Sequence, residues 1–189
     1  VFWFQEAGSK GAFHNPNGQS LKRAFLASPL AFSRVSSRYG MRFHPISGRE
    51  KPHLGVDFAA PTGTPVRSVG DGKVTYAGWK SGYGNFVVVQ HSDQKSTAYA
   101  HLSRIGVRKG QSVEQGALIG AVGSTGASTG PHLHFEYLVR HQHQDPLTLA
   151  RDGGSATVTA SAKAEFKRQA QAIRQQLDAA ATVVQASAE

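Results

Sequence analysis

Two histidines and one glutamate alternate along a short segment of this chain. Residues 130–136 read Gly-Pro-His-Leu-His-Phe-Glu, and the apolar residues in and after this segment favour a strand over a helix. Because side chains alternate across a strand, His132, His134 and Glu136 should share one face. Two imidazoles spaced about 7 Å apart along a strand can converge on one ion or one substrate, since zinc binds nitrogen at about 2.0–2.1 Å.

A second segment pairs an imidazole with a carboxylate, His53 with Asp57. Gly55 and the glycine- and proline-rich residues 59–65 disfavour a helix, but a strand also places positions i and i+4 on one face. His53 and Asp57 then offer two ligands that His134 can complete to a three-ligand site with an open fourth position. A plain surface ion pair between His53 and Asp57 is an equal alternative.

Several of these residues keep two interpretations. The spacing allows either His132 or His134, or both, to touch a metal. Glu136 is either a hydrogen-bond acceptor for an imidazole N–H or a surface carboxylate. Asn85 either forms its glycine-rich turn or binds a substrate backbone. The interpretation of His44 is structural, and solvated surface positions are predicted for the histidines in polar surroundings, His14, His91, His141 and His143.

Composition limits the classes of protein that fit. With 189 residues, 39% apolar residues, 21 glycines and 8 prolines, the chain suits one main, strand-based and turn-rich domain. Cysteine is absent, so any metal must be held by His, Asp or Glu. Lys and Arg number 21 against 12 acids. This basic balance favours a polyanionic partner, namely nucleic acid, an anionic membrane or an anionic cell-wall polymer. The absence of a nucleic-acid-binding pattern argues against the first of these.

The elements that must position the histidines are short strands. Apolar runs at 66–69, 73–77, 86–90 and 117–122 alternate with glycine-bearing turns, which predicts an antiparallel β core over residues 33–150. We expect residues 1–32 to be the remnant of an upstream domain and a connector, with about two helical turns at 20–26.

The C-terminal residues differ in composition from this core. Residues 151–189 should form a linker and a helix, because Phe166, Ala170, Ile173 and Leu177 recur at helical spacing. No apolar run approaches the roughly 18 residues that cross a bilayer, and the first residue is Val. We therefore expect a soluble chain that is a processed form or a piece of a longer protein.

Three motifs follow one another along the chain: His53-x-x-x-Asp57, Tyr99-Ala100-His101-Leu102 and Gly130-Pro131-His132-Leu133-His134. In this order and spacing they closely resemble the lysostaphin-type (LytM-like) zinc endopeptidases of peptidoglycan, in their Gram-negative envelope type. The resemblance covers residues 33–146 and extends through further matching segments, Gly40-x-Arg42-x-His44-Pro45, Pro61-x-Gly63-Thr64-Pro65-Val66, Gly82-Tyr83-Gly84-Asn85 and Gly123-Ser124-Thr125-Gly126.

The resemblance implies a mainly β, lysostaphin-type peptidase core in which His53, Asp57 and His134 bind Zn²⁺ and His101 and His132 form the catalytic pair. It implies hydrolysis of peptidoglycan peptide cross-links by a D,D-endopeptidase, at D-alanyl to meso-diaminopimelate bonds. The partners are then peptidoglycan peptide stems, and the location is the periplasm or cell envelope of a Gram-negative bacterium. The sequence leaves the oligomeric state open.

Two other functions compete with this hypothesis. One is a catalytically silent wall-binding or amidase-activating module of the same fold, which the presence of all five site residues disfavours. The other is a lipoyl or biotinyl carrier barrel, suggested by the sequence patterns of residues 70–74 and 110–116. A carrier needs a modifiable lysine on a displayed hairpin, and no such motif is evident.

Overall fold

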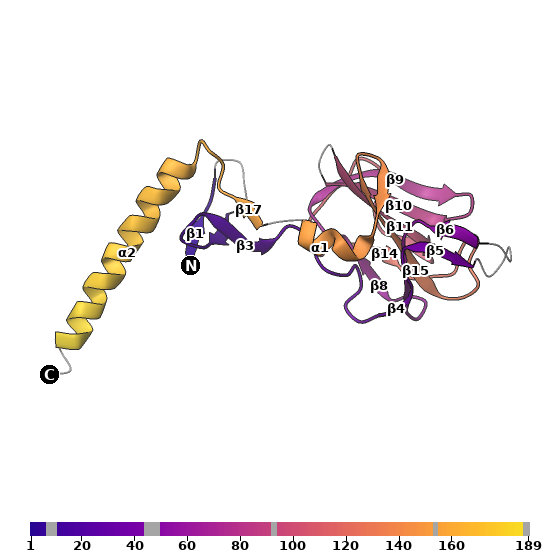
Figure 1. Ribbon diagram of the computed structural model, residues 1–189, viewed down its shortest axis with the longest axis horizontal. Coiled ribbons are helices and arrows are strands. Elements are labelled where there is room, and N and C mark those ends of the chain that lie inside the picture. Colours follow the sequence, from indigo (N-terminus) through magenta and orange to yellow (C-terminus); the bar gives the residue numbers. More distant parts are fainter. Residues whose placement is uncertain (7–10, 44–49, 92–93, 153–154, 187–189) are drawn as a thin grey trace. The chain divides into compact units, whose positions relative to one another are not determined.

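The computed structural model describes residues 1–6, 11–43, 50–91, 94–152 and 155–186. By its internal contacts the chain divides into two compact units, one formed by Phe25–Gly153 and the other by Val1–Ala24 together with Gly154–Glu189. Antiparallel strands dominate, and one long helix lies near the C-terminus (Figure 1). The expected mainly β architecture with a C-terminal helix is therefore confirmed, whereas the expected domain boundaries stay predictions.

The larger unit, described by itself, is built on an antiparallel sheet that carries the histidine motifs. Its strand order is β13-β9-β10-β11-β15-β7-β4, and β16 pairs with β15. Because β7, β15 and β11 are neighbours, three segments far apart in sequence lie side by side. The bounds are β4 Arg34–Ser37, β7 Val56–Ala59, β9 Gly72–Lys80, β10 Gly84–Gln90, β11 Lys95–Leu102, β13 Ser112–Val113, β15 His132–Val139 and β16 Gln142–Gln144.

Smaller elements complete this unit. A three-stranded sheet joins β12 (Arg104–Ile105), β14 (Leu118–Ala121) and β8 (Pro65–Arg67), and a hairpin joins β5 (Gly40–Phe43) to β6 (Glu50–His53). A 3₁₀ turn, η1 (Pro146–Thr148), and the short helix α1 (Leu149–Asp152) follow β16.

Large buried side chains fix the register of the strands that carry the site. Tyr99 on β11 and Phe135 on β15 are opposite one another, and their ring centroids lie 5.2 Å apart. Both side chains are buried, as is Leu133 on the same strand. A slip by one residue would turn these side chains away from the core. Their packing therefore fixes the strand register, and with it the direction of the alternate residues of β15, which include His132 and His134.

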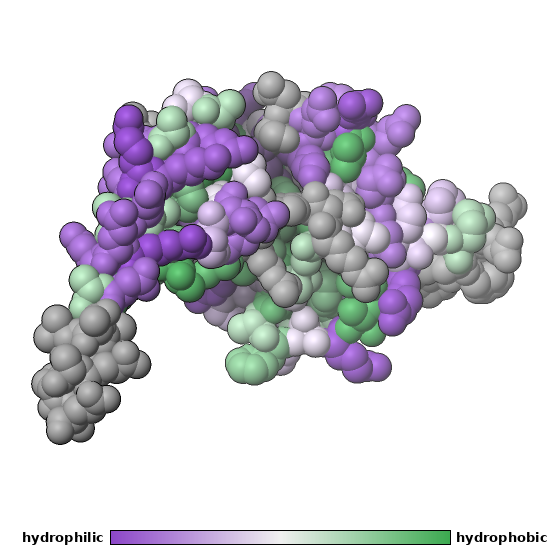
Figure 2. All heavy atoms as spheres, turned by 60° about the vertical axis from the view of Figure 1, so that its left-hand side comes forward, coloured by the Kyte–Doolittle hydropathy of each residue, from purple (hydrophilic) through white to green (hydrophobic). Residues whose placement is uncertain are grey.

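The smaller unit, described by itself, is a four-stranded sheet with one long helix. The sheet order is β1-β2-β3-β17, and the bounds are β1 Phe2–Phe4, β2 Ala12–His14, β3 Gln19–Arg23, β17 Ser155–Thr157 and α2 Lys163–Ala186. Its hydrophobic cluster consists of Phe2, Phe4, Val158, Phe166 and Ala170. The side chains that α2 exposes are largely hydrophilic (Figure 2). None of the helices in the described part of the chain is long and apolar enough to span a membrane.

The helix expected at residues 20–26 is wrong, because Gln19–Arg23 form strand β3. Asn15 explains the difference: its side-chain oxygen accepts hydrogen bonds from the backbone N–H groups of Asn17 and Gln19, which closes a turn between β2 and β3. Strand pairing within the sheet then outweighs the local helix propensity of this segment.

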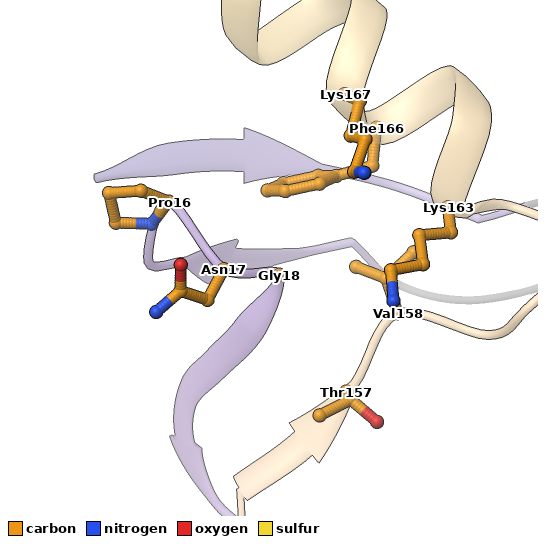
Figure 3. A pocket seen from close by; sticks show the side chains of 8 residues that line it. All are labelled: Pro16, Asn17, Gly18, Thr157, Val158, Lys163, Phe166 and Lys167. Atoms are coloured by element: carbon orange, nitrogen blue, oxygen red, sulfur yellow. The ribbon is translucent and has the colours of Figure 1, made fainter.

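A pocket of the smaller unit lies between this turn and the start of α2 (Figure 3). It is lined by Pro16, Asn17, Gly18, Thr157, Val158, Lys163, Phe166 and Lys167. Figure 3 shows the ring of Phe166 reaching from the helix towards the turn. Its lining contains neither a histidine nor a carboxylate, so the pocket has none of the residue types predicted for the metal site.

Candidate metal centre

The three predicted metal ligands lie together in the larger unit. Asp57 on β7 is directly opposite His134 on β15, and His53 ends β6 just before the chain turns into β7. All three side chains are buried. Gly55 makes this approach possible, because a Cβ at that position would lie 2.5 Å from the carbonyl oxygen of Phe135 and 2.8 Å from the His134 ring.

The ligand atoms form a small triangle. Oδ1 of Asp57 lies 3.0 Å from Nε2 of His53 and 2.8 Å from Nδ1 of His134, and these two nitrogens are 3.1 Å apart. Around a tetrahedral zinc with bonds of about 2.0–2.1 Å, ligand atoms stand about 3.3 Å from one another. The three atoms therefore need to move apart only slightly to hold zinc, and two imidazoles with one carboxylate are a donor set that zinc accepts.

The outward nitrogen of each histidine predicted to bind the metal has its own acceptor. Nδ1 of His53 donates to the backbone carbonyl of Arg38 at 2.8 Å, and Nε2 of His134 donates to Oε1 of Glu136 at 3.1 Å. In a neutral imidazole the other nitrogen then carries a lone pair, which in both residues points towards Asp57. The tautomers required for metal binding are thus already selected by the fold.

Buried charges in this cluster compensate one another. Burial disfavours the carboxylate of Asp57, but its close contacts with His134 and His53 outweigh burial and hold its pKa well below the usual range. Burial likewise disfavours the charged form of His134, yet its bonds to Asp57 and Glu136 raise its pKa to about 9. Asp57 and Glu136 together therefore favour a positive charge at this position.

His101 is the last residue but one of β11 and has an unusual backbone conformation. Its φ is 58°, and the register between β10 and β11 shifts between Asn85 and Val87, opposite His101 and its predecessor. Such bulges with left-handed residues re-aim a side chain at the end of a strand. Nδ1 of His101 donates to the backbone carbonyl of Thr125 at 2.8 Å, so Nε2 is the nitrogen left as an acceptor.

His132 is held in the same way beside it. Its Nδ1 donates to the backbone carbonyl of Gly130 at 2.8 Å, and its Nε2 lies 3.9 Å from Oδ1 of Asp57. The rings of His101 and His132 are 4.8 Å apart. Burial lowers the pKa of His101 to about 4, so this imidazole is neutral near pH 7. Two imidazoles, each with its Nδ1 proton committed to a carbonyl, therefore flank the metal cluster.

The structure thus brings together all five predicted site residues, and their roles remain predictions. Spacing left open which of His132 and His134 would face a metal. The geometry favours His134, because its Nδ1 lies 2.8 Å from Oδ1 of Asp57 and completes the triangle with His53. Nε2 of His132 lies farther from the same oxygen, at 3.9 Å.

Other residues around the site gave weaker signals in the sequence. Glu136 is buried, and both Tyr83 and His143 are bonded to its carboxylate. Thr125 supplies the carbonyl that orients His101. Asn85 donates its side-chain N–H to backbone carbonyls at the end of β11 and just beyond, so its amide serves the fold. Only the alternation of β15 pointed to Glu136, and no local pattern predicts the other contacts.

The predictions for the remaining histidines were partly wrong. His14 is buried against Phe4 and Phe166 instead of being solvated. His91 and His143 are partly buried, and each has side-chain hydrogen bonds. His141 is exposed, as expected. His44 lies outside the described residues.

Comparison with known proteins places this geometry in context. A family model described as peptidase family M23 matches residues 51–146, which include all five predicted site residues. The chain is 46% identical over 140 residues to the peptidoglycan DD-endopeptidase ShyC of Vibrio cholerae, covering 74% of this chain and 32% of that protein. It is 45% identical over 150 residues to the DD-carboxypeptidase/endopeptidase Mpg of Neisseria meningitidis, covering 79% of this chain and 34% of that protein. The chain thus spans about a third of these curated relatives.

Solved structures resemble this chain as well. A zinc-containing peptidase from Vibrio cholerae aligns with a TM-score of 0.63 at 42% identity, over 75% of this chain and 47% of that chain. The catalytic domain of lysostaphin from Staphylococcus simulans aligns with a TM-score of 0.58 at 38% identity, over 63% of this chain and 92% of that domain. The likeness to lysostaphin agrees with the resemblance found in the sequence motifs.

Proposed function

The chain belongs to peptidase family M23, and from this premise we propose that it is a zinc metalloendopeptidase that hydrolyses peptide cross-links of bacterial peptidoglycan. The observation that carries the proposal is the buried triangle of His53 Nε2, Asp57 Oδ1 and His134 Nδ1. Three protein ligands with a fourth position left for water or substrate are typical of catalytic zinc sites.

The proposed roles follow from the donor atoms. His53, Asp57 and His134 would hold Zn²⁺ through the three atoms of the triangle. When bound, the ion would polarise the scissile carbonyl and lower the pKa of a water from its very high value in bulk solvent to about 7. Both ligand histidines keep their outward N–H groups on Arg38 and Glu136, which prevents either ring from rotating out of the site.

His101 and His132 supply the proton transfers in this proposal. A neutral imidazole with its Nδ1 proton bonded to a carbonyl presents Nε2 as a base, which can take a proton from the attacking water. Once protonated, the same nitrogen can donate to the tetrahedral oxyanion and then to the departing amine. No glutamate base is required.

The substrate class is inferred from the relatives and from charge. The two curated relatives compared above have names that include endopeptidase, and one name specifies peptidoglycan. With 21 basic against 12 acidic residues, this chain suits an anionic wall polymer. We assign the cleaved bond to the D,D class, between D-alanine and meso-diaminopimelate. Such a substrate places the protein in the cell envelope, and in the periplasm of a Gram-negative bacterium.

The test combines metal content with turnover. Purified protein should bind one zinc and release un-cross-linked stems from purified dimeric muropeptides, measured by chromatography with mass detection. His134→Ala should lose both zinc and activity. His101→Ala should keep zinc but lose about 10²–10⁴-fold in kcat, the usual contribution of general acid–base catalysis.

Three outcomes would count against parts of the proposal. Wild-type protein without zinc and without product would refute the enzyme. Zinc binding without product from any muropeptide would favour a silent wall-binding module. Loss of zinc from His101→Ala would show that the ligand and proton-transfer roles are assigned wrongly.

A further inference from the structure

Glu136 is the member of the alternating face of β15 that the proposed mechanism leaves without a chemical step. It lies two residues beyond His134, and its side chain is almost fully buried, with 3% of the residue exposed. A buried carboxylate costs several kcal/mol unless hydrogen bonds compensate for the lost water. Glu136 therefore needs partners within the fold, and those partners indicate what it does.

Three side chains from three segments contact this carboxylate. Oε1 accepts hydrogen bonds from the Tyr83 hydroxyl at 2.9 Å and from Nε2 of His134 at 3.1 Å, and Oε2 lies 3.2 Å from Nε2 of His143. Tyr83 comes from the turn between β9 and β10, and His143 from β16, which pairs with β15. Both oxygens are thus held, so the carboxylate has a single orientation towards His134.

Tyr83 is itself fixed by the catalytic region. Its backbone carbonyl accepts a hydrogen bond from the N–H of His101 at 2.8 Å, and its ring centroid lies 4.6 Å from that of Phe86. Burial raises the pKa of the Tyr83 hydroxyl, with a further contribution from Glu136, so this hydroxyl remains a donor. The acceptor for His134 is thereby connected to the backbone that carries His101.

The charges of this arrangement suit a divalent cation. Asp57 and Glu136 each carry one negative charge in a buried cluster, and the imidazoles are neutral when they ligate a metal. Two buried carboxylates then balance one dication, although only Asp57 is in the triangle of ligand atoms. An imidazole that donates its distal N–H to a carboxylate also becomes a better ligand.

We infer that Glu136 is a positioning residue that holds His134 in its metal-binding tautomer, and that Tyr83 and His143 fix Glu136 for this task. The inference rests on the proposed zinc-binding role of His134. It assigns a role to His143, which the sequence alone predicts to be a solvated surface residue.

Zinc affinity measured by competition with a chelator of known affinity tests the inference. Glu136→Gln keeps an acceptor but removes the charge, and should weaken zinc binding about 10-fold; Glu136→Met removes both and should weaken it by about 100-fold. Tyr83→Phe and His143→Ala should each cause a smaller loss. The matched control is Thr97→Val, which removes a buried hydroxyl bonded to Tyr99 and should lower the unfolding temperature without changing zinc affinity.

A spectroscopic readout separates positioning from general destabilisation. In ¹H–¹⁵N NMR spectra of the zinc-loaded wild type, the Nε2 proton of His134 should exchange slowly with solvent because Glu136 accepts its hydrogen bond, and in zinc-loaded Glu136→Met the same proton should exchange much faster. If Glu136→Met does not fold, the affinity of Glu136→Gln decides. A zinc affinity of Glu136→Gln within about twofold of the wild type would overturn the inference, since loss of a hydrogen-bond partner of a metal ligand normally lowers metal affinity by about 10–100-fold. Failure of the wild type to bind zinc would instead refute the proposed function.

Discussion

Replacing Gly55 by alanine tests how closely the ligand loop approaches β15. The added Cβ would lie 2.5 Å from the carbonyl oxygen of Phe135 and 2.8 Å from Cε1 of His134. Carbon atoms pack best at about 3.5–4.0 Å, so the loop and β15 must separate by about 1 Å. The carbonyl belongs to a paired central strand and cannot rotate away, which leaves the loop and the His134 ring to move.

The expected effect has two parts. Overpacking of this kind destabilises a core by about 1–3 kcal/mol, and each kcal/mol lowers the unfolding temperature by about 4 °C in a unit of this size. The displacement would also lengthen the 2.8 Å separation between Asp57 Oδ1 and His134 Nδ1. We therefore expect zinc affinity to fall by about 10-fold or more, as for other changes that misplace a ligand.

Calorimetry of the metal-free protein and chelator competition measure the two parts separately. Gly78→Ala on β9 is the matched control, because the nearest atom to its added Cβ would be 3.8 Å away, an ordinary contact. The control should retain the wild-type zinc affinity. An alanine at position 55 that left both the unfolding temperature and the zinc affinity unchanged would refute the close approach on which the ligand geometry depends.

Three further predictions concern charge, pH and the smaller unit. Replacing a hydrogen-bond partner of a metal ligand weakens zinc binding by about 10–100-fold, and Asp57→Asn should weaken it by more, because it alters a predicted ligand atom itself. A zinc affinity equal to that of the wild type, measured by chelator competition, would remove Asp57 from the ligand set. Burial lowers the pKa of His91 in the folded protein below its value of about 6.5 in the unfolded chain. The contribution of His91 to the free energy of unfolding is therefore complete above pH 6.5, roughly, and is lost as the pH falls through the folded-state pKa. Urea titrations should therefore show that the difference in unfolding free energy between wild type and His91→Gln becomes smaller as the pH is lowered. A difference that becomes larger at acidic pH would contradict this prediction. Phe166→Ala should destabilise the smaller unit by about 3–5 kcal/mol, seen as faster hydrogen exchange in α2, whereas Leu177→Ala, at a side chain that is 63% exposed, should change exchange little.

The accuracy of the sequence-based predictions varied with the range of the interactions involved. The C-terminal helix was predictable because Phe166, Ala170 and Ile173 repeat at helical spacing, and Phe166 and Ala170 are buried in the structure. Strand β3 was not, because the pairing of Gln19–Arg23 with β2 and β17 outweighs local helix propensity. The predicted solvation of His14 is wrong for a similar reason, since its polar neighbours in sequence do not reveal the aromatic rings that pack on it.

The sequence by itself determined which side chains are available for chemistry. Without cysteine, a zinc site had to use His, Asp or Glu, and the alternation of β15 put His132, His134 and Glu136 on one face. Motif order was sufficient to identify the family, because it does not depend on knowing how the segments meet.

Only the tertiary structure decided which nitrogen of each histidine faces the site. The acceptors that orient His53, His101 and His134 are the Arg38 carbonyl, the Thr125 carbonyl and the buried Glu136. Two of these three are backbone atoms on distant segments, and any residue type supplies a carbonyl, so no sequence pattern marks them. The pairing of β7, β15 and β11 brings the predicted metal ligands Asp57 and His134 into one cluster with His101 and His132.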